Sequence, residues 1–169
     1  SGKNKQYRNR IVIPSYDRYD VLNYWVGRDY TGTSNRKVIN AKTSKTDIIF
    51  NESKINWYEP ITLVEGPFDH IVTPNSIPLL GKSLNEEYAL YDALFERSRS
   101  DIRIFLDDDA IKNAYKIYRL LNKGKLEGRV YVVDTPNGYD PSLIFQEYGK
   151  DGILNALCGA RRINEFEYI

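Results

Sequence analysis

The sequence predicts an α/β protein whose central sheet is mostly parallel and is preceded by a small β-rich unit. Three observations predict it. Short apolar segments alternate with helix-like segments after residue 60, acidic residues follow two of these apolar segments directly, and the first 60 residues show strand-like segments without a helical period. Strands that alternate with helices are typical of βαβ units, which form parallel sheets. The length of 169 residues suits one domain with a small appendage.

The first 60 residues predict three short strands. Arg10 to Pro14 is a strand that ends in proline, and Val21 to Val26 is a second strand rich in aromatic residues. A polar loop follows, and 37–39 is the third strand. This small unit ends near Pro60, where the pattern changes.

The remaining residues predict strands and helices in turn. Ser83 and Glu86 have capping-box spacing and indicate the start of a helix. Apolar residues at helical spacing indicate a helix after Asp109, and Pro141 stands at a favoured first helical position. The expected strands are 61–64, 76–80, 102–106 and 129–133, and the expected helices are 83–96, 110–123, one from Pro141, and 151–157.

Composition excludes several classes of protein. The chain has one cysteine, Cys158, and one histidine, His70, so neither an internal disulfide framework nor a four-ligand structural zinc site is expected. No apolar run reaches the ~18 residues of a membrane helix, so we expect no membrane contact. Residues 1–60 hold 11 Lys/Arg and 6 Asp/Glu, whereas 61–169 hold 13 and 17, giving net charges of +5 and −4. A basic front part suits a polyanion and an acidic rear part suits cations.

Acidic residues recur where the predicted strands end. Glu65 and Asp69 follow the strand 61–64, Asp107 and Asp109 follow the strand 102–106, and Asp140 lies in a later loop. Because parallel strands end at the same edge of a sheet, these carboxylates should lie close together and repel one another. Oxygen ligands without cysteine or histidine favour Mg²⁺ or Mn²⁺, and two ions are expected. Three aspartates in a row could also form nothing more than a solvated turn.

The ordered acids resemble the TOPRIM domain, which bacterial-type primases, topoisomerases and some nucleases share. The resemblance rests on Glu65, Gly66 and Asp69 after one strand and on Asp107 and Asp109 after a later one. The front part resembles the small subdomain that precedes TOPRIM in DnaG-type primases. There, similar segments read as a strand ending in proline, a strand ending in Gly-Arg, here Gly27 and Arg28, and a motif matching 37–40.

The resemblance implies roles for individual residues. Glu65 would be the acid closest to catalysis, with Asp107 and Asp109 also catalytic, and the metal ligands would be Glu65, Asp69, Asp107, Asp109 and Asp140. Arg10, Arg28 and Lys37 would contact phosphates of template or nucleotide, and Lys82, just before the helix expected from residue 83, is a candidate phosphate ligand. The chain departs from the family pattern at Asp108, where a glycine is usual, at Ser142, where a further acid is common, and at Glu52, where a basic residue is common.

The implied function is DNA primase activity, the templated synthesis of short RNA primers from ribonucleoside triphosphates on single-stranded DNA. A TOPRIM-type nuclease and a non-catalytic nucleic-acid-binding module remain the alternatives. We expect a small basic subdomain at 1–58, a TOPRIM catalytic domain at 59–160 and a tail at 161–169. A replicative helicase would bind through parts outside this chain, and the expected location is the cytoplasm of a bacterial or phage-infected cell.

Overall fold

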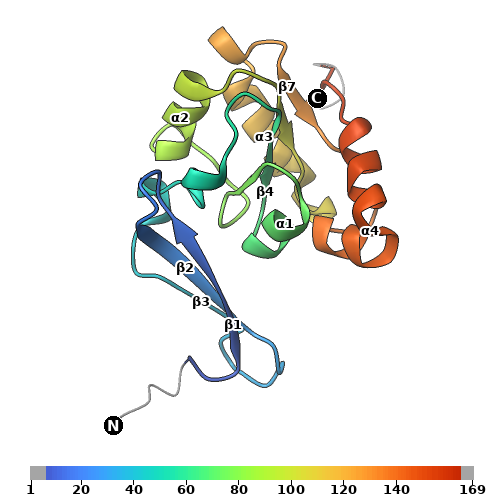
Figure 1. Ribbon diagram of the computed structural model, residues 1–169. Coiled ribbons are helices and arrows are strands. Elements are labelled where there is room, and N and C mark those ends of the chain that lie inside the picture. The colour runs from blue at the N-terminus through green and yellow to red at the C-terminus, as the bar shows by residue number, and fades with distance from the viewer. Residues whose placement is uncertain (1–6, 165–169) are drawn as a thin grey trace.

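The computed structural model describes residues 7–164, and these residues form two sheets. The small sheet is antiparallel with strand order β1-β2-β3, from β1 (Arg10–Tyr16), β2 (Leu22–Asp29) and β3 (Val38–Asn40). It extends below the α/β body in Figure 1. The three strands predicted in the front part are therefore confirmed.

The larger sheet is parallel throughout, as predicted. Its order is β5-β4-β6-β7, from β4 (Ile61–Val64), β5 (Ser76–Pro78), β6 (Ile102–Ile104) and β7 (Val130–Val132). β4 and β6 are direct neighbours, with Leu63 opposite Ile104. This pairing places the residues after both strands at one edge of the sheet.

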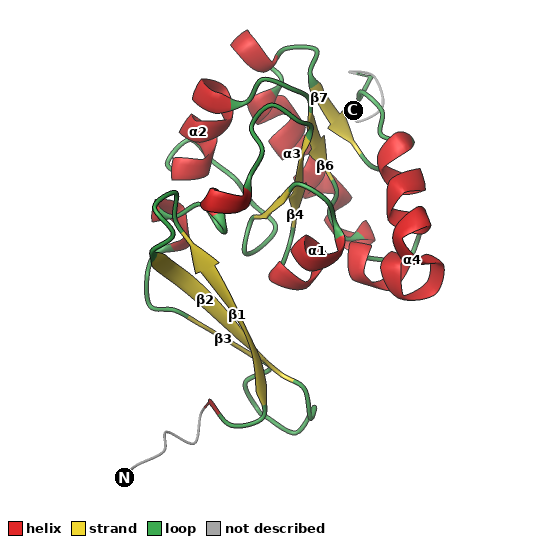
Figure 2. Ribbon diagram, viewed as in Figure 1, coloured by secondary structure: helices red, strands yellow, loops and turns green. Residues whose placement is uncertain are grey.

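Helices cover both faces of the parallel sheet (Figure 2). α2 (Ala89–Arg97) and α3 (Ile111–Leu121) pack in one core with Ile61, Leu63 and Ile104. α1 (Pro67–Val72) and α4 (Pro141–Cys158) pack on the other side with Val64, Phe105 and Val133. Successive strand residues point to opposite faces, which is why neighbours such as Leu63 and Val64 serve different cores.

One helix prediction needs correction. The helix expected from residue 83 begins at Ala89, because Leu84 and Tyr88 enter the core first, and Glu86 pairs with Lys123 instead of closing a capping box. The two helices expected after Pro141 are confirmed: they lie within α4 and are separated at Gly149, where the backbone is not helical and its φ of 64° suits glycine. In the described part of the chain, no helix is both long and apolar enough to cross a membrane. Residues 165–169 of the expected tail lie outside the described residues.

The small sheet is joined to the α/β body by a buried polar network. The Asn51 amide nitrogen lies 3.1 Å from Nε2 of His70 on α1, and the Asn51 backbone N–H donates to Oγ of Ser15 on β1 at 2.9 Å. Nδ1 of His70 lies 3.0 Å from Oγ of Ser76 on β5, and burial lowers the pKa of His70. The network fixes the small sheet relative to the α/β body.

Candidate active site

The ends of β4 and β6 position the first acids of the site. Glu65 follows β4 directly, and Phe105 extends the pairing of β6 by donating to the Leu63 carbonyl at 2.8 Å. The chain then turns away from the sheet, and the Asp107 backbone N–H donates to Oε1 of Glu65 at 3.2 Å. This bond joins two acids that are 42 residues apart in sequence.

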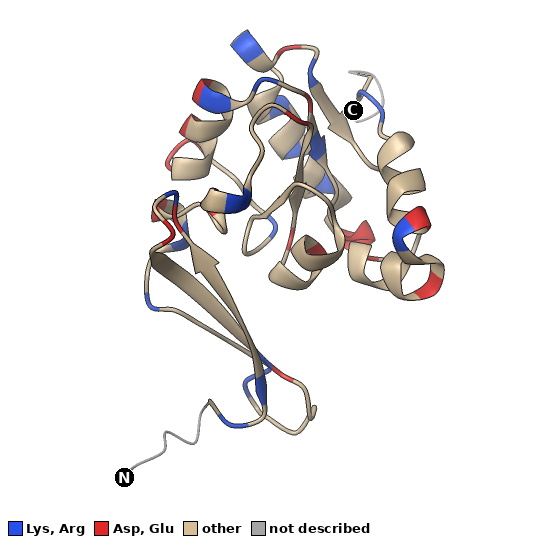
Figure 3. Ribbon diagram, viewed as in Figure 1, with Lys and Arg blue, Asp and Glu red and all other residues tan. Residues whose placement is uncertain are grey.

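The structure brings all five predicted acids together in two triads. One triad is Glu65, Asp107 and Asp109, and the other is Asp69, Asp107 and Asp140; in each, one oxygen per residue lies within 4.8 Å of the others. Asp107 belongs to both triads. Figure 3 shows the acidic segments gathered between α1 and the start of α4.

Local hydrogen bonds hold the second triad in place. Asp69 accepts from the Gly66 N–H at 3.1 Å and from Oγ of Ser142 at 2.7 Å. Asp140 is the N-cap of α4, and its carboxylate accepts from the Leu143 N–H at 2.6 Å. Ser142, which replaces the acid common in the family pattern, therefore supports Asp69 through its hydroxyl.

Burial and mutual repulsion make the negative charges of these carboxylates costly, which favours the binding of cations. Burial, together with Glu65, Asp69 and Asp140, raises the pKa of Asp107 from 3.8 to about 7. Burial also raises the pKa of Glu65 and of Asp69. Oδ1 of Asp107 is buried and has no hydrogen-bond partner among the described residues. A divalent cation would supply that partner and the missing positive charge, so the residues present fit Mg²⁺ or Mn²⁺.

Lys82 faces the first triad from a strained loop. Its ammonium forms an ion pair with Asp109, and this hydrogen bond raises the pKa of Lys82. The loop passes through Leu80, whose φ of 54° is unusual for a residue other than glycine. Nζ of Lys45, from the segment that joins the two sheets, donates to the Leu80 carbonyl at 3.4 Å. Lys45, which sequence reasoning missed, thus braces the turn that carries Lys82.

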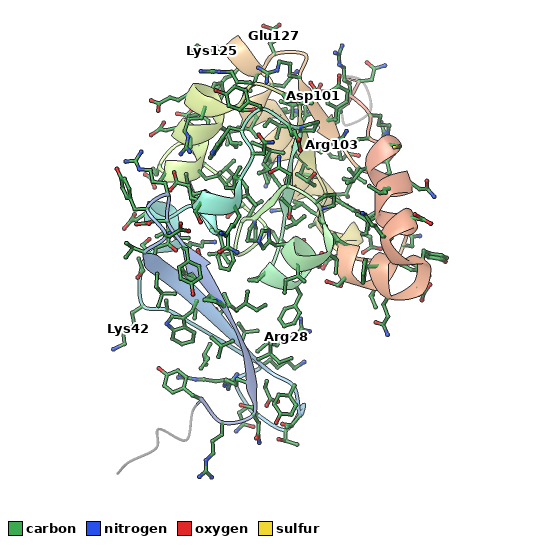
Figure 4. All side chains as sticks on the ribbon, in the orientation of Figure 1. Arg28, Lys42, Asp101, Arg103, Lys125 and Glu127 are labelled. Carbon is green, nitrogen blue, oxygen red and sulfur yellow. The ribbon has the colours of Figure 1, made fainter. Side chains whose placement is uncertain are left out.

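A cleft of about 560 Å³ lies in front of the acids, between them and the small sheet. Its sheet side includes Arg28 of β2, whose guanidinium lies 4.9 Å from the centre of the Phe68 ring on α1. Figure 4 labels Arg28 beside the small sheet, on the side toward α1, and Lys42 on the other side. Arg28 is therefore the one of the three predicted phosphate-binding residues of the small subdomain that lines this cleft.

Arg10 and Lys37 lie elsewhere. The Arg10 guanidinium donates to the backbone carbonyls of Arg36 at 2.7 Å and Lys37 at 3.3 Å, so it fixes the loop before β3. Lys37 is exposed at the start of β3. Their contact with phosphates remains a prediction.

The other departures from the family pattern have visible local partners. Asp108 accepts from the Gly138 N–H at 2.6 Å, which ties the acidic turn to the loop before α4. Glu52 forms an ion pair with Arg97, and the Arg97 guanidinium stacks over the Trp57 ring at 4.1 Å. Neither contact was foreseeable from spacing, because both join segments distant in sequence.

The parallel sheet, its flanking helices and the acids at its edge have the arrangement of a TOPRIM fold, here preceded by a small antiparallel sheet. Comparisons with known proteins narrow this class. DNA primases of Staphylococcus aureus strains COL and MRSA252 are 26% identical to this chain over 161 residues, which cover 86% of this chain and 26% of the relative. The chain thus spans about a quarter of the length of these relatives. No family model matches the sequence.

Solved structures agree in fold. The primase of Aquifex aeolicus, comprising zinc-binding and RNA polymerase domains, superposes with a TM-score of 0.73 at 24% identity, covering 96% of this chain and 44% of the other. A DNA primase domain from Pseudomonas aeruginosa gives 0.76 at 20% identity, covering 95% and 56%. A DnaG primase catalytic domain bound to single-stranded DNA gives 0.76 at 17% identity, covering 92% and 53%. Sequence and fold together support a DnaG-type primase core.

Proposed function

We propose that this chain is the catalytic core of a DNA primase, a nucleotidyltransferase that joins ribonucleoside triphosphates into short RNA primers on a single-stranded DNA template. The observation that carries the proposal is the pair of acidic triads that share Asp107 at the edge of the parallel sheet. The similarity of this chain to DNA primases, over 86% of its length, supports the same function. Such a protein would act in DNA replication in a bacterial or phage-infected cell.

The cofactor proposed is Mg²⁺ or Mn²⁺, with one ion at each triad. Glu65, Asp107 and Asp109 would hold the first, and Asp69, Asp107 and Asp140 the second. When bound, the ions supply stabilisation of the negative charge that develops during phosphoryl transfer. Glu65 is either a ligand or a general base that accepts the proton of the attacking hydroxyl.

Other side chains would bind and orient the nucleotide. Lys82 carries its ammonium beside the first triad, where it pairs with Asp109, and it would pair with a phosphate group of the bound nucleotide. Arg28 presents its guanidinium to the same cleft from the small sheet. The acid edge would therefore hold cations, whereas Lys82 beside it and Arg28 on the opposite wall would offer positive charge to the nucleotide and the template.

A polymerisation assay tests the proposal. The protein is incubated with single-stranded DNA, labelled ribonucleoside triphosphates and Mn²⁺, and labelled oligoribonucleotides are expected. Glu65→Gln and Asp107→Asn should abolish product without changing the folded fraction, whereas the exposed control Asp151→Asn should remain active. Anomalous diffraction from crystals soaked with Mn²⁺ and a nucleotide counts the ions.

Two other outcomes would replace this function. Cleaved nucleic acid without oligoribonucleotides would identify a TOPRIM-type nuclease. No turnover by the wild-type protein, together with a nucleic-acid affinity that Glu65→Gln leaves unchanged, would identify a non-catalytic binding module.

A further inference from the structure

The far end of the small sheet holds a second cavity, which we call the distal cup. Its volume is about 400 Å³, and none of the residues that line it lines the cleft in front of the acids. Figure 3 shows Lys and Arg segments gathered at this end of the sheet. The cup is lined by Arg8, Asn9, Arg10, Asp29, Thr31, Thr33, Ser34, Asn35, Arg36 and Ile39.

Internal hydrogen bonds give the cup an ordered wall. Arg10 donates to Oγ of Ser34 at 3.0 Å and to the Arg36 carbonyl at 2.7 Å. Asp29 accepts from Oγ1 of Thr31 at 2.9 Å and from the Ser34 N–H at 3.3 Å. The charges of Arg10 and Asp29 are thus engaged in shaping the loop, and the wall exists before any ligand arrives.

Two further arginines are left for a ligand. Arg8 and Arg36 are exposed, and neither side chain makes a hydrogen bond or ion pair with any residue in the range 7–164. Guanidinium groups often bind phosphate oxygens in a bidentate manner, and such charge-assisted hydrogen bonds are stronger than bonds between neutral groups. The cup therefore presents two free phosphate-binding groups on a preformed wall.

The cup and the cleft lie on opposite faces of the same end of the sheet. Successive strand residues alternate between faces, so Arg28 and Val38 line the cleft while Asp29 and Ile39 line the cup. β3 is the edge strand, and the exposed Lys37 stands at its start. Positive charge therefore continues from the cup, past Lys37 and around the β3 edge, to Arg28 in the cleft.

We propose that the distal cup binds the phosphodiester backbone of single-stranded DNA, and that the strand passes around the β3 edge into the cleft. This inference rests on the proposed function, because it supplies the path of the template to the acidic triads. A flexible single strand suits this path, since a chain of phosphates must bend around the β3 edge of the three-stranded sheet. Arg8 and Arg36 serve as anchors remote from the acids.

The test uses the double variant Arg8→Gln/Arg36→Gln, with Lys116→Gln/Arg119→Gln as a matched control. The control residues lie on the exposed face of α3 and remove the same two charges. Fluorescence anisotropy with a labelled single-stranded oligonucleotide is recorded over a range of salt concentrations. The cup variant should bind roughly tenfold more weakly at low salt, and its salt-dependence slope should fall by about 1.4, since each phosphate contact contributes about 0.7.

A second probe separates the sources of phosphate. Binding of Mn²⁺ with a ribonucleoside triphosphate, and of inorganic phosphate, should be the same in the wild type and the cup variant. Equal losses for the oligonucleotide and the triphosphate would overturn the inference in favour of a nucleotide site. Equal losses in both double variants, or no loss in either, would also overturn it.

A gain of affinity guards against misfolding as the cause. Asn35→Lys adds a cation at the rim of the cup and should tighten oligonucleotide binding and steepen the salt dependence. An unchanged affinity would count against the cup. If the wild type binds Mn²⁺ with a nucleotide but does not bind the oligonucleotide, the template path is refuted and the proposed function is still supported. If it binds the oligonucleotide but does not bind Mn²⁺ with a nucleotide, the proposed function alone is refuted.

Discussion

Replacing Asp107 with asparagine should stabilise the metal-free protein at alkaline pH. The pKa of Asp107 is higher in the folded chain, at about 7, than the value of about 3.9 expected after unfolding. Folding is therefore most favoured below about pH 4, where both states hold the proton, and stability is lost as the pH rises through about 7. Asparagine keeps the shape of the protonated acid and carries no such cost.

The size of the effect follows from the difference in pKa. A rise of about three units corresponds to roughly 4 kcal/mol at pH 8 for a fully buried group. Asp107 is partly exposed, so solvent screening reduces this to about 2 kcal/mol. The same reasoning leaves roughly 0.5 kcal/mol at pH 4.5. For a chain of this length, 2 kcal/mol corresponds to a rise in Tm of about 4 to 8 °C.

Thermal and urea unfolding in EDTA at pH 4.5 and pH 8 measure the difference, with Asp151→Asn as the exposed control. The stabilisation by Asp107→Asn should grow by about 1.5 kcal/mol between the two pH values, and the control should show no such growth. Adding Mn²⁺ at pH 8 should raise the Tm of the wild type more than that of the variant. A stabilisation by Asp107→Asn that is equal at both pH values, or a destabilisation at pH 8, would refute the raised pKa of Asp107.

Three further predictions concern the surroundings of the site. Lys82→Met, which removes the partner of Asp109, should raise the KM for ribonucleoside triphosphate at least fivefold in steady-state assays, whereas an unchanged KM would exclude phosphate contact. Lys45→Met should raise the same KM about threefold, because the turn before Lys82 loses the hydrogen bond to the Leu80 carbonyl. Lys45→Arg should restore the wild-type KM, and a KM that stays raised in this variant would argue against a role of Lys45 in positioning Lys82. Glu52→Gln should lower the free energy of unfolding by about 2 kcal/mol, since it removes the negative charge that neutralises the partly buried Arg97, and a change within 0.5 kcal/mol of zero in urea unfolding would contradict this.

The sequence was sufficient to predict the parallel sheet and the meeting of its acids. β4 and β6 are short, mostly apolar strands, Glu65 follows the first and Asp107 lies three residues past the second, and a parallel sheet brings such ends to one edge. That Glu65 and Asp107 lie close together follows from that rule without any knowledge of side-chain packing. This is why acids separated by dozens of residues were correctly grouped.

Contacts that depend on tertiary packing were not predictable in this way. Ser83 and Glu86 have the spacing of a helix cap, but burial of Leu84 and Tyr88 delays the start of α2. The engagement of Arg10 by backbone carbonyls depends on the path of a loop 24 to 27 residues away. Local pattern gives the type of an element, whereas its ends and its side-chain partners are set by neighbours distant in sequence.

The membership of Asp107 in both triads has a consequence for how mutations would be tolerated. Loss of Asp109 or of Asp140 removes one member from one triad and leaves the other complete. Loss of Asp107 leaves neither complete, so this position has no substitute elsewhere in the described chain. Because the two triads share one carboxylate, five acids form them instead of six, and no other acid in them can replace the shared one.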